Sequence, residues 1–182
     1  MNKKVKGIPI VAVLGSVRPD NNTAHALALV VDEFKKHADV SLEIVNPDDF
    51  DLPFPGKGTN SSIDSLQKKI FSARGIILAT PEYNGSYSSV IKLIIENLGD
   101  PSVLCGKPVV LLGVASGSIG AVKALEHLAS VCLNEGAIVL PGFVSVARVH
   151  KVFSAQGKCS DQDIEKRVRG LANILLNYIQ NT

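Results

Sequence analysis

The sequence predicts an α/β fold in which helices cover both faces of a parallel sheet. Two observations lead to this prediction. Apolar runs of strand length alternate with stretches whose apolar residues recur at helical spacing, and mostly short polar segments separate them. Such alternation produces right-handed βαβ units with parallel strands. No internal repeat or linker divides the 182 residues, so we expect one domain spanning residues 1–182.

Apolar spacing defines the elements of the first half of the chain. The first helix places Leu27, Val31 and Phe34 on one stripe, as expected for a helix that packs on a sheet. A Pro- and Gly-rich loop, NPDDFDLPFPGKGTNS, separates the second strand from the second helix. The predicted elements are a strand at 8–14, a helix at about 22–37, a strand at 41–45, a helix at about 62–73 and a strand at 75–80.

The second half continues the alternation, with a helix from about residue 88, a strand at 108–115, a helix at 119–134, a strand at 137–141 and a helix at about 161–179. Each helix has apolar residues at the spacing of one buried face. In the helix from about residue 88 these residues are Ile91, Ile94, Ile95 and Leu98. In the helix at 119–134 they are Ile119, Val122, Leu125, Ala129 and Cys132. In the helix at about 161–179 they are Ile164, Val168, Leu171, Leu175 and Ile179.

Strand composition predicts the order of the sheet. The strands at 8–14, 75–80 and 108–115 are continuously apolar, as expected when both faces of a strand are covered. The strand at 41–45 alternates and the strand at 137–141 is short, which is typical of edge strands. The predicted order is therefore 2-1-3-4-5. In such a sheet, ligands bind beyond the carboxyl ends of strands one and three, where the winding reverses.

Composition argues against several classes of protein. Hydrophobic residues make up 46% of the chain, which argues against disorder, and no apolar run approaches the length of a membrane span. The net charge of +2 does not indicate a nucleic-acid partner, and the basic runs KKVK and EKRVR are interpreted as solvated faces. Three cysteines without a CxxC pair argue against disulfides or zinc and indicate a reducing, cytoplasmic setting. The start, MNKKVKGIPIVAVLGS, is better explained by a core strand than by a signal peptide.

The loop after the first strand, GSVRPDNNT, has the composition of a phosphate-binding loop. Gly15 permits a tight turn, Arg18 supplies a planar cation, and a helix N-terminus follows. Its short polar side chains belong to Ser16, Asn21, Asn22 and Thr23. The alternative is an ordinary helix start in which Asn or Thr is the cap and Arg18 is solvated.

The loop after the third strand, TPEYNGSYSS, has the composition of a ligand-shaped loop. Pro81 and Gly85 favour an unusual backbone path that lets main-chain groups face a ligand. Tyr83 offers a flat ring, and Asn84 offers both a donor and an acceptor. The alternative is a turn into the next helix with one of the following serines as its cap. Glu82 is a possible general acid, although a capping or structural role is expected for it.

The loop after the fourth strand, ASGSIG, leaves backbone N–H groups free at another helix start. Its glycine pattern departs from the dinucleotide-binding fingerprint, and no acidic residue follows to hold a ribose. The four histidines are dispersed, with no spacing for a metal site. A G-x-S-x-G elbow is absent, which argues against a serine hydrolase.

Three such loops after neighbouring strands suit a planar, phosphorylated cofactor, and they resemble motifs of the NADPH-dependent FMN reductase family. GSVRPDNNT is similar to the family's GSxR phosphate loop, and PEYNGSYSSVIKLIIE to its PEYNGS(x)PGxLKNAID signature. GSIGAVKALEHL is similar to its third loop and helix. The resemblance covers roughly residues 8–155. It implies a flavodoxin-like three-layer sandwich with FMN as the cofactor.

The resemblance also implies an activity and assigns residues to parts of the flavin. The expected enzyme passes hydride from NADPH or NADH through FMN to a small acceptor such as a quinone, an azo compound or a metal oxyanion, and it forms a homodimer or homotetramer. Because the cofactor carries this reaction, no catalytic residue is nominated. The phosphate would lie near Ser16, Arg18, Asn21, Asn22 and Thr23. The isoalloxazine would lie against Pro81, Glu82, Tyr83, Asn84, Gly85 and Ser86, with Ser116, Gly117, Ser118 and Gly120 on its other side.

Two alternatives from other functional classes remain. A non-enzymatic flavin electron carrier would be expected to have a strongly acidic surface, and the small positive net charge argues against it. The other alternative is a phosphate-ligand binding or regulatory module that has lost its flavin.

Overall fold

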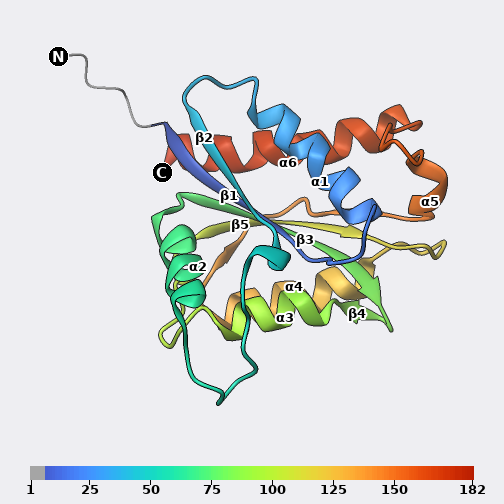
Figure 1. Ribbon diagram of the computed structural model, residues 1–182. Helices are drawn as coiled ribbons and strands as arrows, with labels where there is room; N and C mark the ends of the chain where they lie inside the picture. The colour runs from blue at the N-terminus through green and yellow to red at the C-terminus, as the bar shows by residue number, and fades with distance from the viewer. Residues whose placement is uncertain (1–6) are drawn as a thin grey trace.

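A parallel sheet forms the middle layer of the molecule, as the computed structural model of residues 7–182 shows (Figure 1). The basic run at residues 3–6 lies outside the described residues. The order of the parallel strands is β2-β1-β3-β5-β6, which confirms the predicted order 2-1-3-4-5. These strands are β1 (Ile8–Leu14), β2 (Val40–Val45), β3 (Gly75–Tyr83), β5 (Pro108–Val114) and β6 (Ile138–Val139).

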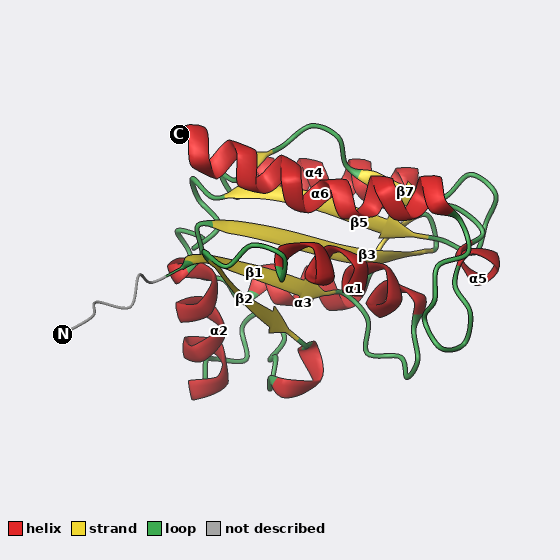
Figure 2. Cartoon of the chain, turned by 90° about the horizontal axis from the view of Figure 1, so that it is seen from above, coloured by secondary structure: helices red, strands yellow, loops and turns green. Residues whose placement is uncertain are grey.

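Helices cover both faces of the sheet (Figures 1 and 2). One face carries α1 (Asn22–Phe34) and α6 (Gln162–Asn181). The other carries α2 (Ser61–Ser72), α3 (Ser89–Glu96) and α4 (Val122–Asn134). A 3₁₀ turn (Pro47–Asp49) follows β2, and a single helical turn, α5 (Val149–Val152), precedes α6. No helix within residues 7–182 is long and apolar enough to span a membrane.

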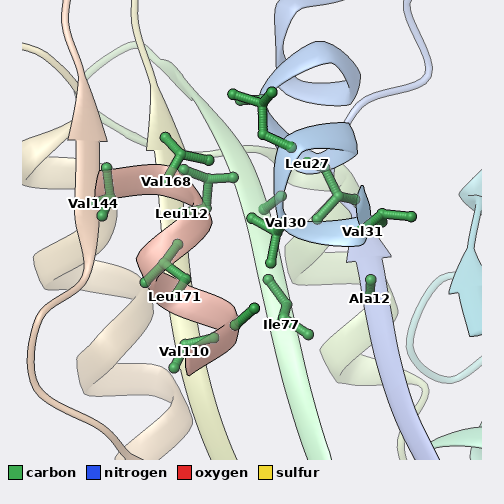
Figure 3. Close-up of a cluster of buried hydrophobic side chains, with 14 of the residues drawn as sticks. Ala12, Leu27, Val30, Val31, Ile77, Val110, Leu112, Val144, Val168 and Leu171 are labelled. Atoms are coloured by element: carbon green, nitrogen blue, oxygen red, sulfur yellow. The ribbon is translucent and has the colours of Figure 1, made fainter. Parts of the chain in front are cut away.

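Each face of the sheet has its own hydrophobic core, because successive strand residues point to opposite sides. Ala12, Ile77 and Leu112 face α1 and α6, where they meet Val30 and Leu171 (Figure 3). Their neighbours along the same strands face α3 and α4 instead. Strands buried on both faces must be apolar at every position, which explains the continuous apolar runs of β1, β3 and β5.

The predicted fifth strand is split into two pieces. β6 pairs with the start of β5, at Pro108 and Val109, and a separate strand, β7 (Val144–Val146), pairs with its end. The chain between the two pieces contains Pro141, which lacks an N–H, and Gly142, which has a φ of 89°. These residues interrupt the edge strand, and β7 then returns the chain to the carboxyl end of β5.

The helix predicted at 119–134 starts three residues later than expected, at Val122. Gly120 has a φ of 84°, which no helical residue adopts, so the preceding segment is a loop. Ile119 and Val122 are therefore 83% and 41% exposed, and the prediction that they face the core is wrong. The buried stripe of α4 consists of Ala124, Leu125, Leu128 and Cys132.

A buried polar network joins the carboxyl ends of β1 and β3. The N–H of Gly15 donates to the carbonyl of Ala79 at 2.7 Å, and the Ser88 hydroxyl donates to the carbonyl of Gly15 at 2.7 Å. Ser88 Oγ also accepts from the N–H of Ile91, so Ser88 is the N-cap of α3. A Cβ on Gly15 would lie 2.5 Å from both the Ala79 oxygen and Ile91 Cγ1, so only glycine permits this close approach.

We predict that Ser88→Ala lowers the free energy of unfolding by about 1–3 kcal/mol, because it leaves the Gly15 carbonyl and the Ile91 amide without their partner. Ser88 is 1% exposed, so water cannot replace the hydroxyl. Denaturant titration measures the loss, and Ser89→Ala, at the exposed neighbouring position, is the matched control. Equal stability of the two variants would contradict the role assigned to Ser88.

Candidate functional site

A pocket of about 220 Å³ lies at the carboxyl edge of the sheet, where the loops after β1, β3 and β5 meet. Its walls are Arg18, Pro19, Asp20, Asn21, Asn22, Thr23, Pro81, Glu82, Tyr83, Val114, Ala115, Ser116 and Val149. Larger hollows lie elsewhere, including one of about 710 Å³ beside Cys105. The smaller pocket is the candidate site because only here do the three polar loops singled out in the sequence come together.

The start of α1 supplies hydrogen-bond donors to this pocket. Asn21 is the N-cap: its Oδ1 accepts from the Ala24 amide at 2.8 Å, and its Nδ2 donates to the Arg18 carbonyl at 2.7 Å. The capping role considered as the alternative is therefore correct for Asn21. The amides of Asn22 and Thr23 come before the Ala24 amide that Asn21 caps. They have no partner within the helix and point out of its N-terminal end. Thr23 is 2% exposed and also lines the pocket.

Arg18 connects the first loop to the second. Its guanidinium carbon lies 4.6 Å from the centre of the Tyr83 ring, which is the geometry of a cation–π contact. The Arg18 side chain is exposed, as the helix-start alternative expected, but its guanidinium packs on the Tyr83 ring. Ser16, which was expected beside the phosphate, is buried beneath the loop, where its Oγ accepts from the Arg18 amide at 3.4 Å.

The second loop is a hairpin. β3 was expected to end at residue 80, but it continues to Tyr83 and pairs antiparallel with β4 (Ser86–Tyr87). The turn residues Asn84 and Gly85 have φ values of 52° and 73°, as in a type I′ turn, for which Asn-Gly is the preferred sequence. The unusual backbone path predicted for this stretch is this turn, and the following helix is capped by Ser88.

Glu82 and Ser145 together cap α4. Ala121 precedes that helix and offers no capping side chain. Glu82 Oε2 instead accepts from the Ala124 amide at 3.1 Å, and the Ser145 hydroxyl of β7 accepts from the Ala121 amide at 2.8 Å. A Cβ on Gly120 would lie 2.3 Å from Ser145 Oγ, so this loop needs glycine there. Glu82 thus has the structural role that was expected for it.

Several predicted residues lie outside the pocket wall, namely Ser16, Asn84, Gly85, Ser86, Gly117, Ser118 and Gly120. Two of them, Gly85 and Gly117, border open space, since an added Cβ would meet no atom within 4 Å. They leave room for a ligand larger than the pocket.

Sequence analysis missed other wall residues. Val149 was missed because β7 was not predicted, and β7 is what brings the segment after it alongside the loop after β5. The backbone amides of Arg148 and Val149 donate to the carbonyls of Gly117 and Ala115. Backbone strain is concentrated around the site: within residues 7–182, the non-glycine residues with positive φ are Asp20, Asn84 and Arg148.

Burial shifts the pKa of two ionisable side chains of α4 and β4. Burial raises the pKa of the Cys132 thiol to about 12, so this α4 cysteine stays protonated. Burial also raises the pKa of Tyr87, beside the hairpin. Within residues 7–182, no cluster of His, Cys, Asp or Glu is arranged to hold a metal ion.

The donor set fits FMN. A phosphate requires N–H and O–H donors with a positive field, which the α1 amides, Thr23 and Arg18 supply. A flat ring requires a planar wall and space above it. Tyr83 provides the wall, and the open positions at Gly85 and Gly117 provide the space.

Comparison with known proteins agrees with this fold. Residues 8–151 match the family model "NADPH-dependent FMN reductase", and the chain belongs to this family. A 2-hydroxy-1,4-benzoquinone reductase of Burkholderia sp is 33% identical over 133 residues, covering 69% of this chain and 70% of that protein. An FMN-dependent NADPH-azoreductase of Staphylococcus aureus is 26% identical, covering 93% of this chain and 94% of that protein.

Solved structures show the same fold at low sequence identity. The flavoenzyme NAD(P)H:(acceptor) oxidoreductase FerB of Paracoccus denitrificans superposes with a TM-score of 0.80 at 21% identity, covering 94% of this chain and 97% of FerB. A flavodoxin of Streptococcus pneumoniae TIGR4 superposes with a TM-score of 0.59 at 19% identity, covering 93% and 97% of the two chains. The predicted flavodoxin-like three-layer sandwich is thereby confirmed.

We predict that Glu82→Ala lowers the free energy of unfolding by about 1–2 kcal/mol, because α4 loses the acceptor for its Ala124 amide. Glu82→Gln keeps an acceptor oxygen and should lose less than half as much. Glu126→Ala, which removes a carboxylate from an exposed position of α4, is the control. Thermal or denaturant unfolding measures all three, and a stable Glu82→Ala variant would contradict the capping role.

Proposed function

We propose that the pocket binds FMN and that the protein uses it to pass hydride from NADPH or NADH to a small acceptor. The observation that carries this proposal is the meeting of three loops around one pocket whose walls include both phosphate-type donors and the flat Tyr83 ring. Membership of the NADPH-dependent FMN reductase family supports both cofactors and an oxidoreductase activity.

Each part of the pocket has a proposed task. The amides of Asn22 and Thr23, the Thr23 hydroxyl and Arg18 would hold the phosphate. The hairpin, through Pro81 and Tyr83, would set the plane of the ring, and Ser116 in the third loop would close its other side. FMN, when bound, supplies the hydride chemistry. The chain's residues bind it, orient it and leave one face open to a second molecule.

A quinone or an azo compound is the acceptor class that the comparisons favour, since relatives bear the names of a benzoquinone reductase and an azoreductase. A metal oxyanion remains an acceptor to test. The open space beside Gly85 and Gly117 would admit a flat aromatic molecule.

We further propose a single domain that forms a homodimer or homotetramer in the cytoplasm. The exposed apolar residues Ile119, Val122 and Leu133 on and before α4 support association. The cysteines are unpaired, as expected in a reducing compartment.

We predict that the purified protein binds about one FMN per chain and that NADPH or NADH bleaches this flavin without oxygen. A quinone added afterwards should restore the yellow colour. Stopped-flow absorbance measures both half-reactions. If a partner reductase bleaches the flavin but neither NADPH nor NADH does, the protein is an electron carrier and not a reductase. Failure to bind FMN at all would contradict both functions and favour a module without flavin.

We predict that Arg18→Ala weakens FMN binding by one to two orders of magnitude, since a charged hydrogen bond to phosphate contributes about 1.5–3 kcal/mol. Riboflavin, which lacks the phosphate, should bind both proteins with nearly equal affinity. Calorimetry measures each affinity, and Arg167→Ala, at an exposed position of α6, is the matched control. Equal losses for FMN and riboflavin would place the phosphate elsewhere.

A further inference from the structure

A serine–histidine pair joins the hairpin to α4, and its histidine has no role in the functions described above. Ser86 Oγ on β4 and His127 Nδ1 on α4 are 3.0 Å apart, although 41 residues separate them in the sequence. Ser86 stands directly opposite Tyr83 in the hairpin register, and Tyr83 forms a wall of the pocket. Ser86 thus lies just outside the pocket wall, next to a residue of the proposed ring site, and His127 is exposed.

The surroundings leave the His127 ring without a fixed charge partner. Within residues 7–182, no carboxylate forms an ion pair with it. The strands β5 and β6, which pack under α4, carry no titratable side chain. The titratable groups on the remaining elements next to it are Glu82 and Tyr83 of β3, Tyr87 of β4, and Lys123, Glu126 and the buried Cys132 of α4 itself. Of these, Glu82 is already bonded to the Ala124 amide.

The direction of the Ser86–His127 hydrogen bond depends on whether the imidazole carries a second proton. A neutral ring with Nδ1 unprotonated accepts the Ser86 O–H. A protonated ring donates Nδ1–H to Ser86 Oγ instead, and the serine O–H is then free to donate to another acceptor. Protonation of His127 thus converts Ser86 from an occupied donor into a free one, and exposure to solvent lets the ring regain its proton.

We propose that Ser86 donates to the acceptor the proton that its two-electron reduction requires, and that His127 orients and reprotonates the Ser86 hydroxyl. This inference rests on the proposed reductase function. A quinone becomes a hydroquinone by gaining one hydride, which carries both electrons, and one proton. The Ser86 O–H bond breaks as the new O–H bond of the acceptor forms. The Nδ1–H bond of His127 breaks as the serine O–H re-forms, and water then returns a proton to the ring.

The test compares two acceptors with different proton needs. The holo-protein is reduced with NADPH without oxygen and then mixed with benzoquinone or with ferricyanide, which takes single electrons and no proton. His127→Asn keeps an amide near the position of Nδ1 but cannot titrate, and Ser86→Ala removes the donor. In both variants, the ratio of the benzoquinone rate to the ferricyanide rate should be about 100-fold lower than in the wild type. His37→Asn, on the segment between α1 and β2, is the histidine control.

The pH dependence separates proton delivery from mere support of the hairpin. In the wild type, the benzoquinone rate should fall as pH rises, because the protonated imidazole is the form that reprotonates Ser86. The His127→Asn protein should lack this fall. In the flavin-free protein, ¹⁵N spectra of the imidazole should show the Nδ1 signal of His127 shifted by Ser86→Ala, and not by Ser89→Ala.

Three results would overturn the proposal. One is a His127→Asn protein with the wild-type benzoquinone rate and pH profile. Another is equal slowing with both acceptors, which would mean that the substitution damages the site. In either case NADPH still bleaches the wild-type flavin, so the proposed function stands. The third is a wild-type flavin that NADPH does not bleach, in which case the proposed function fails and the proton-delivery proposal fails with it.

Discussion

The hydrogen bond from Ser88 to the Gly15 carbonyl fixes the geometry on which the candidate site depends. The loops after β1 and β3 are adjacent in space because the sheet places those strands side by side, but adjacency alone does not set their register. The buried serine hydroxyl and the Gly15–Ala79 backbone bond hold the first loop against the second. With that contact fixed, Arg18 reaches the Tyr83 ring, and the start of α1 faces the hairpin across the pocket.

The polar residues of the three loops divide into those that build the site and those left for a ligand. Asn21 and Glu82 are engaged in capping α1 and α4, and Ser16 is buried under its loop. Arg18, Asn22 and Thr23 line the pocket without a capping role. Two helix starts are thus stabilised by side chains around the site, which keeps the ligand-facing donors in fixed positions. A pre-ordered donor set costs less conformational entropy on binding.

Much of the fold could be predicted because burial on both faces demands apolar residues at every strand position, and β1, β3 and β5 show this directly. The site's location followed from strand order, and its phosphate-type loop from composition. The features that were not predicted depend on contacts between residues far apart in the sequence. β7 has only three residues and exists because β5 offers it a partner. The cap of α4 comes from Glu82 and Ser145, which lie far from that helix in sequence, so no local pattern near Ile119 marks where the helix starts.

The most direct test of the account is to map where FMN contacts the chain. Adding FMN to the ¹⁵N-labelled, flavin-free protein should shift amide signals of residues 15–25, 80–88 and 115–120, and of the segment around Val149. Signals of the Pro- and Gly-rich segment at 51–60 and of the carboxyl half of α6 should stay in place. Shifts confined to those distant segments, or no shifts at saturating FMN, would contradict the claim that the three loops form one flavin site.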